Sequence, residues 1–143
     1  MKIALLKKED ITPEIQTQIS VLFKQLAPDK NQIHLNEIFN DKNDISIAYA
    51  IDDGEILGIA SVCIYSVISG KKGWIEDVVV HENARGKGLG RKLMNKLLEV
   101  AKEKNLTEIL LFSAEHRVAA KNLYEDLGFM MNASKLYKLP LNY

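Results

Sequence analysis

The chain cannot form an internal disulfide bond, because its 143 residues include a single cysteine, Cys63. A chain without disulfides is typical of a reducing compartment, and we expect a cytoplasmic protein. Long hydrophobic runs are also missing, since none approaches the ~20 apolar residues of a membrane-spanning helix. The opening segment, MKIALLKKED, has only a brief apolar run before its charges, so we expect neither a signal peptide nor a membrane partner.

A surplus of charge is lacking as well. The 19 basic and 19 acidic side chains cancel, so no broad basic field favours nucleic acid as a partner. The histidines, His34, His81 and His116, lie far apart without the spacing of metal ligands, and we expect no metal. The length and the apolar content of 47% suit one soluble globular unit, so we expect a single domain over residues 1–143.

Two hydrophobic periodicities divide the chain. Apolar runs and alternation predict strands at residues 1–8, 44–52, 55–69, 74–80, 107–114 and, most weakly, 129–141. Helical spacing predicts helices at residues 10–27, 31–40, 89–102 and 115–128. In the second of these, Ile33 and Ile38 are expected to be buried, with Leu35 as a further candidate. The strands from 44 to 80 are typical of an antiparallel meander, and the strand at 107–114 is apolar enough to be buried on both faces. The pattern predicts a mixed α/β layer structure with one sheet.

The stretch ARGKGLGRKL, residues 84–93, is rich in glycine and begins a helix. Glycines and basic residues are interleaved in it: Arg85, Gly86, Lys87, Gly88, Gly90 and Arg91. The first amides of a helix lack intrahelical acceptors, and the helix dipole adds positive charge there, so this pattern is typical of a phosphate site. Neither the P-loop nor the dinucleotide fingerprint matches its spacing. The alternative is a glycine-rich turn that only starts a helix.

Two motifs in the latter half resemble the GNAT superfamily of acetyl-CoA-dependent N-acetyltransferases. The cofactor motif of that family, R/Q-x-x-G-x-G/A, is matched by Arg85, Gly88 and Gly90. A second family motif, LYExLGF, is matched by Leu123, Tyr124, Glu125, Leu127, Gly128 and Phe129. The resemblance implies the GNAT-type acyltransferase fold, a central and mostly antiparallel sheet flanked by about four helices. It also implies acetyl-CoA as co-substrate.

The resemblance assigns a set of cofactor-binding residues. Amides from Gly86 to Arg91, Leu89 included, would hold the pyrophosphate of CoA. The backbone of Val78, Val79 and Val80 would pair with the pantetheine arm as an added strand does. Asn122 is a further candidate contact, with a solvated helix asparagine as the alternative. One family contact is replaced, since Arg117 stands where many relatives carry asparagine.

Glu76 and Tyr124 are the catalytic candidates. Amine acetylation needs a base for the ammonium and an acid for the leaving thiolate. Strand alternation puts Trp74, Glu76, Val78 and Val80 on one face, and Ile75, Asp77 and Val79 on the other. Glu76 matches the catalytic glutamate of polyamine N-acetyltransferases and would act directly or through water; the alternatives are a solvated glutamate or one that only binds a cationic substrate. Tyr124 matches the family tyrosine beside the CoA sulfur, with ordinary packing as the alternative.

The resulting hypothesis is an N-acetyltransferase that acts by direct attack of a primary amine in a ternary complex. A small amine, an aminosugar or an amino acid is the expected acceptor. The alternatives are a non-catalytic acyl-CoA-binding module, a protein N-acetyltransferase and a nucleotide-binding module. Dimers are common in the family, so a homodimer is expected from the resemblance. His34 could line the substrate pocket, Trp74 could be core or pocket wall, and Cys63 is expected to be buried filler.

Overall fold

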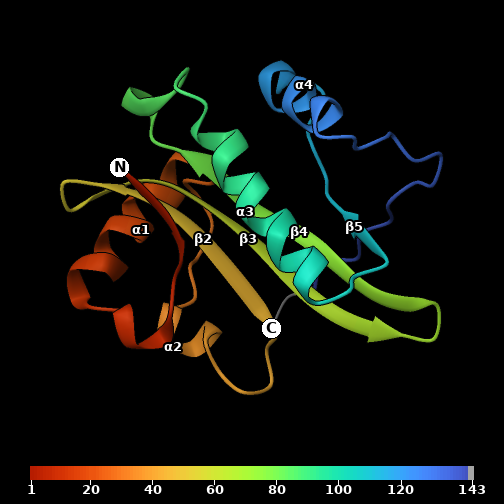
Figure 1. Cartoon of the computed structure of the whole chain (residues 1–143), viewed down its shortest axis with the longest axis horizontal. Coiled ribbons are helices and arrows are strands. Elements are labelled where there is room, and N and C mark those ends of the chain that lie inside the picture. The colour runs from red at the N-terminus through yellow and green to blue at the C-terminus, as the bar shows by residue number, and fades with distance from the viewer. Residues whose placement is uncertain (142–143) are drawn as a thin grey trace. The chain divides into compact units, whose positions relative to one another are not determined.

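The computed structural model describes residues 1–141. In chain order it contains β1 (Lys2–Leu5), η1 (Lys8–Asp10), α1 (Pro13–Leu26), α2 (Leu35–Ile38), β2 (Ile45–Asp52), β3 (Glu55–Val67), β4 (Gly70–Val80), η2 (Glu82–Ala84), α3 (Leu89–Glu103), β5 (Glu108–Leu110) and α4 (Val118–Asp126) (Figure 1). The contacts divide the chain into two compact units, Met1–Phe112 and a second unit that begins at Ser113.

The first unit is built on a five-stranded sheet with the order β1-β2-β3-β4-β5. Neighbouring strands from β1 to β4 are antiparallel, and β5 is parallel to β4. This arrangement confirms the mixed sheet and the meander over β2, β3 and β4. β5 pairs only with the Lys72–Trp74 part of β4. Within the described residues, the outer edge of β4 therefore has no neighbouring strand beyond Trp74.

α1 covers one face of the sheet. Its start is determined by Thr12, whose Oγ1 accepts a hydrogen bond from the Ile15 N–H at 3.2 Å, and by Pro13 in the first turn. The helix buries Ile19 and Leu22 in a cluster with sheet residues of the same face. The sheet residues of that cluster are Ile47, Ile56, Ile59 and Val79. This face is called the α1 face below.

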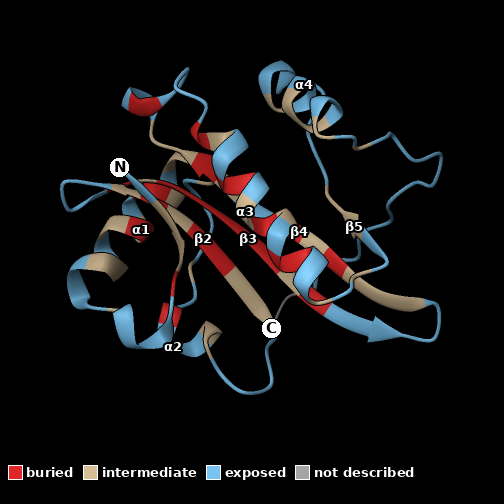
Figure 2. Cartoon of the chain, in the orientation of Figure 1, coloured by how far each residue is buried: buried red, intermediate tan, exposed pale blue. Residues whose placement is uncertain are grey.

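α3 covers the opposite face, as Figure 1 shows in teal. Alternation along β2 and β3 turns small side chains to this face, among them Ala48 and Ala60, both fully buried. These small residues allow α3 to approach closely, and its apolar stripe is buried against them (Figure 2). The stripe comprises Leu89, Leu93, Met94, Leu97, Val100 and Ala101. The predicted amphipathic helix is thus confirmed.

α3 and β3 approach closely at Gly58, and Gly58→Ala is expected to destabilise the fold. A Cβ atom there would lie 2.9 Å from Leu93 Cδ1 and 3.2 Å from the Val79 carbonyl oxygen. We expect the free energy of unfolding to fall by about 1–3 kcal/mol, as overpacked cores do. Urea denaturation measures it, with Ser66→Ala at the exposed end of β3 as the control. An unchanged midpoint would contradict the close packing.

Three sequence predictions are corrected. Residues 129–141 contain no strand; the Ser134 N–H instead donates to Asn132 Oδ1 at 3.2 Å, a local turn that interrupts strand pairing. β5 is shorter than predicted and lies at the sheet edge, so Phe112 is 57% exposed rather than buried. The helix predicted at 31–40 is confined to α2, and Ile33 precedes it with 64% of its surface exposed. Apolar residues of these segments thus remain exposed, Ile33 and Phe112 among them.

Candidate functional site

A β-bulge lies in β4 at Asp77. The register pairs that flank it are Ser61–Glu76 and Ile59–Val79. Two residues of β4, Asp77 and Val78, therefore lie opposite one residue of β3, Ala60. Asp77 adopts φ 53°, a left-handed conformation that aspartate tolerates better than most residues. The bulge changes the direction of the strand and of the side chains that follow it.

The bulge corrects the predicted alternation of β4. Trp74 and Glu76 share the α1 face, as predicted. Val79 lies on that same face, because it belongs to the core cluster of α1. Val80 lies on the α3 face, because it pairs with Gly58. The prediction that Val80 shares the face of Glu76 and that Val79 opposes it is therefore wrong, since the extra residue shifts the alternation by one.

The outer edge of β4 after Trp74 presents backbone groups to a ligand. β5 pairs with no residue of β4 beyond Trp74, and the predicted pantetheine-binding residues Val78, Val79 and Val80 lie on this stretch. Val79 is buried, whereas Val78 and Val80 are half-buried. An extended polar chain can add to such an edge through main-chain hydrogen bonds.

The glycine-rich loop ends at Gly88, the N-cap of α3. Gly86 and Gly88 have φ values of 78° and 75°, a region that non-glycine residues rarely adopt. Glycine brings no capping side chain, and the first helical bond runs from the Lys92 N–H to the Gly88 carbonyl oxygen at 3.2 Å. The amides of Leu89 and Gly90 precede that bond and lie at the positive end of the helix dipole. A Cβ at Gly86 or Gly88 would meet no heavy atom within 4 Å, which leaves room for an anion beside these amides.

The loop is held against the end of β4 by polar contacts. Arg85 Nε donates to the Val80 carbonyl oxygen at 3.3 Å. The Glu82 N–H donates to Gln25 Oε1 at 3.1 Å, which ties the loop to α1. Arg85, Lys87 and Arg91 are all exposed residues of the loop and the first turn of α3. The loop and the first turn of α3 thus carry three exposed basic residues close in sequence to these amides.

Two carboxylates lie side by side at the bulge. The pKa of Glu76 is raised by partial desolvation and by the charge of Asp77, and is lowered by Lys30. Partial desolvation also raises the pKa of Asp77, whereas the charge of Lys30 lowers it. A carboxylate with a raised pKa is a stronger base, which suits a proton acceptor. From its sequence position Asp77 is expected to be structural or a turn partner; its charge also acts on Glu76.

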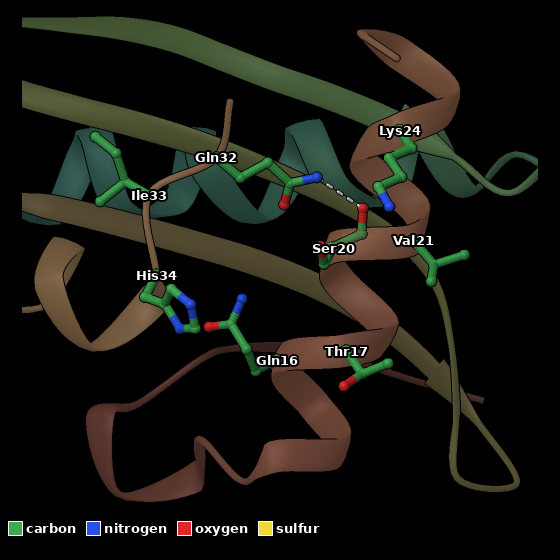
Figure 3. Close-up of a pocket in the computed structure, with 8 residues that line it drawn as sticks. All are labelled: Gln16, Thr17, Ser20, Val21, Lys24, Gln32, Ile33 and His34. Carbon is green, nitrogen blue, oxygen red and sulfur yellow. Dashed lines mark hydrogen bonds between the residues drawn. The ribbon is translucent and has the colours of Figure 1, made fainter. Parts of the chain in front are cut away.

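Lys30, whose charge acts on both carboxylates, lies in the loop between α1 and α2. Two hydrogen bonds hold this loop against α1. Gln32 Nε2 donates to the Ser20 carbonyl oxygen at 3.0 Å (Figure 3). Gln16 Oε1 accepts from the Leu35 N–H at 2.9 Å. Between helix and loop lies a pocket of about 310 Å³. Its lining comprises Gln16, Thr17, Ser20, Val21, Lys24, Gln32, Ile33 and His34. His34 therefore lines a pocket, although its contact with a substrate stays a prediction.

Lys30→Met is expected to raise the pKa of the Glu76 carboxyl group. The lysine charge favours the ionised carboxylate, so its removal makes the proton harder to lose. An NMR titration of the Glu76 carboxyl carbon measures the shift, with Lys24→Met on the exposed side of α1 as the matched control. A Glu76 pKa that is unchanged or lower in Lys30→Met would contradict this electrostatic contact.

Cys63 of β3 lies on the α1 face, as Glu76 does on β4, and its thiol is held protonated. Burial raises its pKa, and the negative charges of Glu76, Asp77 and Asp44 raise it further. A thiol with a raised pKa is a poor nucleophile at neutral pH. These surroundings favour the interpretation of Cys63 as partly buried packing rather than as a reactive residue.

In the second unit, Tyr124 lies on α4 near its C-terminal end. The helix ends in a Schellman motif, in which the Gly128 N–H donates to Glu125 O and the Phe129 N–H donates to Tyr124 O, both at 3.0 Å. The rings of Tyr124 and Phe129 pack edge to face at 6.0 Å. The LYExLGF motif therefore also has a structural role. Its glycine ends α4, and its phenylalanine packs against the ring of the tyrosine.

The phenol of Tyr124 stays protonated at neutral pH. Burial raises its pKa, while the charge of Arg117 at the N-cap of α4 lowers it less. A protonated phenol can donate a hydrogen bond or a proton to a developing anion. Asn122, the other site candidate of α4, is exposed.

Residues 1–141 contain no group of three histidine, cysteine or acidic side chains that could hold a metal ion. The longest helix of this range, α3, has 15 residues. No helix in the described part of the chain reaches the length and apolarity needed to cross a membrane.

Comparisons of this chain with known proteins agree on one family. The family model described as "Acetyltransferase (GNAT) family" matches residues 12–129. A thialysine N-epsilon-acetyltransferase of Mus musculus is 37% identical over 65 residues, which are 46% of this chain and 38% of that protein. The chain thus aligns with well under half the length of this relative.

Solved structures extend the similarity to nearly the whole chain. An acetyltransferase of Trypanosoma brucei has a TM-score of 0.79 at 26% identity, covering 98% of this chain and 99% of its own. The glucosamine-6-phosphate N-acetyltransferase of Arabidopsis thaliana has a TM-score of 0.78 at 26% identity, covering 96% and 97%.

Proposed function

Because the chain belongs to the acetyltransferase (GNAT) family, we propose that it transfers an acetyl group from acetyl-CoA to a primary amine by direct attack in a ternary complex. The observation that carries the proposal is the left-handed Gly88 at the N-terminus of α3, beside a β4 edge without a strand neighbour beyond Trp74 in the described residues. A phosphate site and an edge for an extended arm are what CoA requires. Bound acetyl-CoA supplies the acetyl group as an activated thioester.

The binding residues act through their backbone. Amides of the Gly86–Arg91 loop would hold the pyrophosphate, and Arg85 and Lys87 would add charge around it. Val78, Val79 and Val80 would align the pantetheine arm along β4, with an amide near Val78 as the donor to the thioester oxygen. Asn122 is proposed as a further contact from α4.

Glu76 and Tyr124 are proposed as the catalytic residues. Glu76 would take the proton of the substrate ammonium, whose pKa is roughly 10 in water. Its raised pKa supports this role. Tyr124 would donate to the leaving sulfur, which its protonated phenol supports. Glu76 would thus deprotonate the amine, and Tyr124 would donate a hydrogen bond or a proton to the leaving thiolate.

The acceptor is proposed to be a small amine, an aminosugar or an amino acid. The names of relatives include thialysine in the mouse protein and glucosamine 6-phosphate in the Arabidopsis protein, and both compounds carry primary amines. We further propose that the chain acts as a single domain over residues 1–143, in the cytoplasm and as a homodimer. The single domain rests on the length and apolar content of the chain, the cytoplasmic location on its single cysteine, and the homodimer on the family.

Gly88→Ala tests the cofactor site by CoA binding. An alanine at φ 75° is strained by roughly 1–2 kcal/mol and would distort the first turn of α3. We expect the Kd of CoA, measured by isothermal titration calorimetry, to rise roughly tenfold, the change that 1.4 kcal/mol produces.

Gly54→Ala is the matched control, because Gly54 has φ 79° and equally open surroundings but lies in the β2–β3 turn. It should show the same loss of stability with CoA affinity intact. Equal CoA affinity in the two variants, or tighter binding of ATP than of CoA by the wild type, would contradict the proposed site.

A further inference from the structure

Trp74 and Phe112 form an aromatic pair at the point where β4 and β5 separate. Their ring centroids lie 4.8 Å apart at 67°, an edge-to-face contact. Trp74 is the last residue of β4 that pairs with β5, and Phe112 follows the end of β5 by two residues. Phe112 is 57% exposed, whereas Trp74 is half-buried. The pair therefore presents aromatic surface to solvent at the start of the unpaired β4 edge.

The aromatic pair adjoins the proposed base. Trp74 and Glu76 lie on the same face of β4, two residues apart, which corresponds to about 6.6 Å along a strand. An amine that reaches Glu76 therefore has its neighbouring carbon atoms within reach of the two rings. Such rings favour C–H surface, and their faces also attract an ammonium group.

Two carboxylates, Glu76 and Asp77, lie on β4 near this surface, and the charge of Lys30 acts on both. Two other lysines of the region are paired with carboxylates: Lys72 with Glu108 at 2.9 Å and Lys104 with Asp44 at 2.8 Å. An acceptor with a carboxylate beside its amine would bring a third negative charge next to Glu76 and Asp77. Such a substrate is disfavoured by like-charge repulsion.

We propose that Trp74 and Phe112 select the acceptor: a primary amine on an uncharged alkyl or sugar carbon, rather than the α-amino group of an amino acid. This inference rests on the proposed acetyl transfer and narrows its substrate class. The rings pack against the carbon that bears the amine, and the two carboxylates of the bulge repel an adjacent carboxylate. Phe112 is a specificity residue in this account and takes no part in proton transfer.

Matched amines test the preference. The probes are 2-phenylethylamine against phenylalanine and n-butylamine against norvaline, pairs that differ only in the carboxylate next to the amine; glucosamine serves as the sugar amine. We expect kcat/KM of the wild type to favour the member without the carboxylate by at least about tenfold. A preference for the amino acids would overturn the inference.

Phe112→Ala tests the aromatic wall. It is expected to lower kcat/KM for n-butylamine and glucosamine about tenfold, mainly through KM, without a change in the Kd of CoA. Phe112→Tyr retains the ring and should retain the activity. Val67→Ala, which truncates a side chain 49% exposed at the end of β3, is the matched control.

The outcomes separate the two proposals. If Phe112→Ala behaves as Val67→Ala while the wild type acetylates amines, only the present inference is overturned. If the wild type acetylates none of these probes, amino acids included, the proposed function fails, and this inference fails with it. Loss of activity in Phe112→Ala with retention in Phe112→Tyr and normal CoA binding supports it.

Discussion

Tyr124→Phe is expected to lower kcat by roughly 10²- to 10⁴-fold, the range typical of a lost general acid. The ring remains, so its packing with Phe129 and the end of α4 should be retained. CoA affinity should therefore change little, and the loss should appear in turnover. Steady-state kinetics with a saturating amine, together with calorimetric CoA binding, measure the two effects.

A second tyrosine gives the control for this substitution. Tyr137 lies in the same unit and is 92% exposed, so Tyr137→Phe should leave kcat unchanged. Because burial raises the pKa of Tyr124, wild-type activity should not decline at alkaline pH until the phenol ionises above its usual value of about 10. An unchanged rate in Tyr124→Phe would remove this residue from the mechanism.

Glu76→Gln is expected to have the other large effect, a loss of kcat/KM near neutral pH of roughly 10²-fold or more. In the wild type, the acid limb of the pH profile should lie above the ordinary glutamate pKa of 4.5, because desolvation and Asp77 raise the pKa of Glu76. Below that limb the base is protonated and inactive. Without it, only amine that is already neutral can react, so the profile should move toward the amine pKa, roughly 10.

Neighbouring substitutions make this prediction specific. Asp77→Asn should lower the pKa of Glu76 and move the acid limb to lower pH, because it removes a negative charge that raises that pKa. Glu55→Gln, at the exposed start of β3, should leave the profile unchanged. If Glu76→Gln keeps the wild-type profile shape, Glu76 is not the base.

The features that sequence predicted well depend on local chemistry. The spacing of glycines determines the loop and the N-terminus of α3, since Gly86 and Gly88 occupy conformations that other residues avoid. The apolar period from Leu89 likewise determines which side of α3 is buried. Gly128 ends α4 for a similar reason, as the left-handed residue of its Schellman motif.

The features that sequence missed depend on distant partners. The bulge at Asp77 is a matter of register between β3 and β4, and alternation within β4 alone could not show it. Lys30 and Phe112 come near Glu76 and Trp74 only through the fold. No motif marks either residue, because the α1–α2 loop and the end of β5 are placed by packing rather than by local propensity.

Residues 129–141 illustrate the opposite error. Their apolar side chains suggested a strand, yet Met130 and Tyr137 are 90% and 92% exposed and no ladder forms in this range. Strand propensity is weak without cross-strand partners, and Pro140 removes a backbone donor. A pattern of apolar residues thus indicates which side chains can be buried. Whether they are buried depends on the partners that the rest of the fold provides.

The most direct test of the account is thiol release from acetyl-CoA across a panel of amines, with CoA binding measured in parallel on the same protein. The account predicts that CoA binds and that thiol is released with one class of primary amine. Tight CoA binding without release from any amine would contradict the assignment of Glu76 and Tyr124 as a small-amine acetyltransferase pair. Failure to bind CoA at all would contradict the interpretation of the Gly86–Arg91 loop, on which the whole account rests.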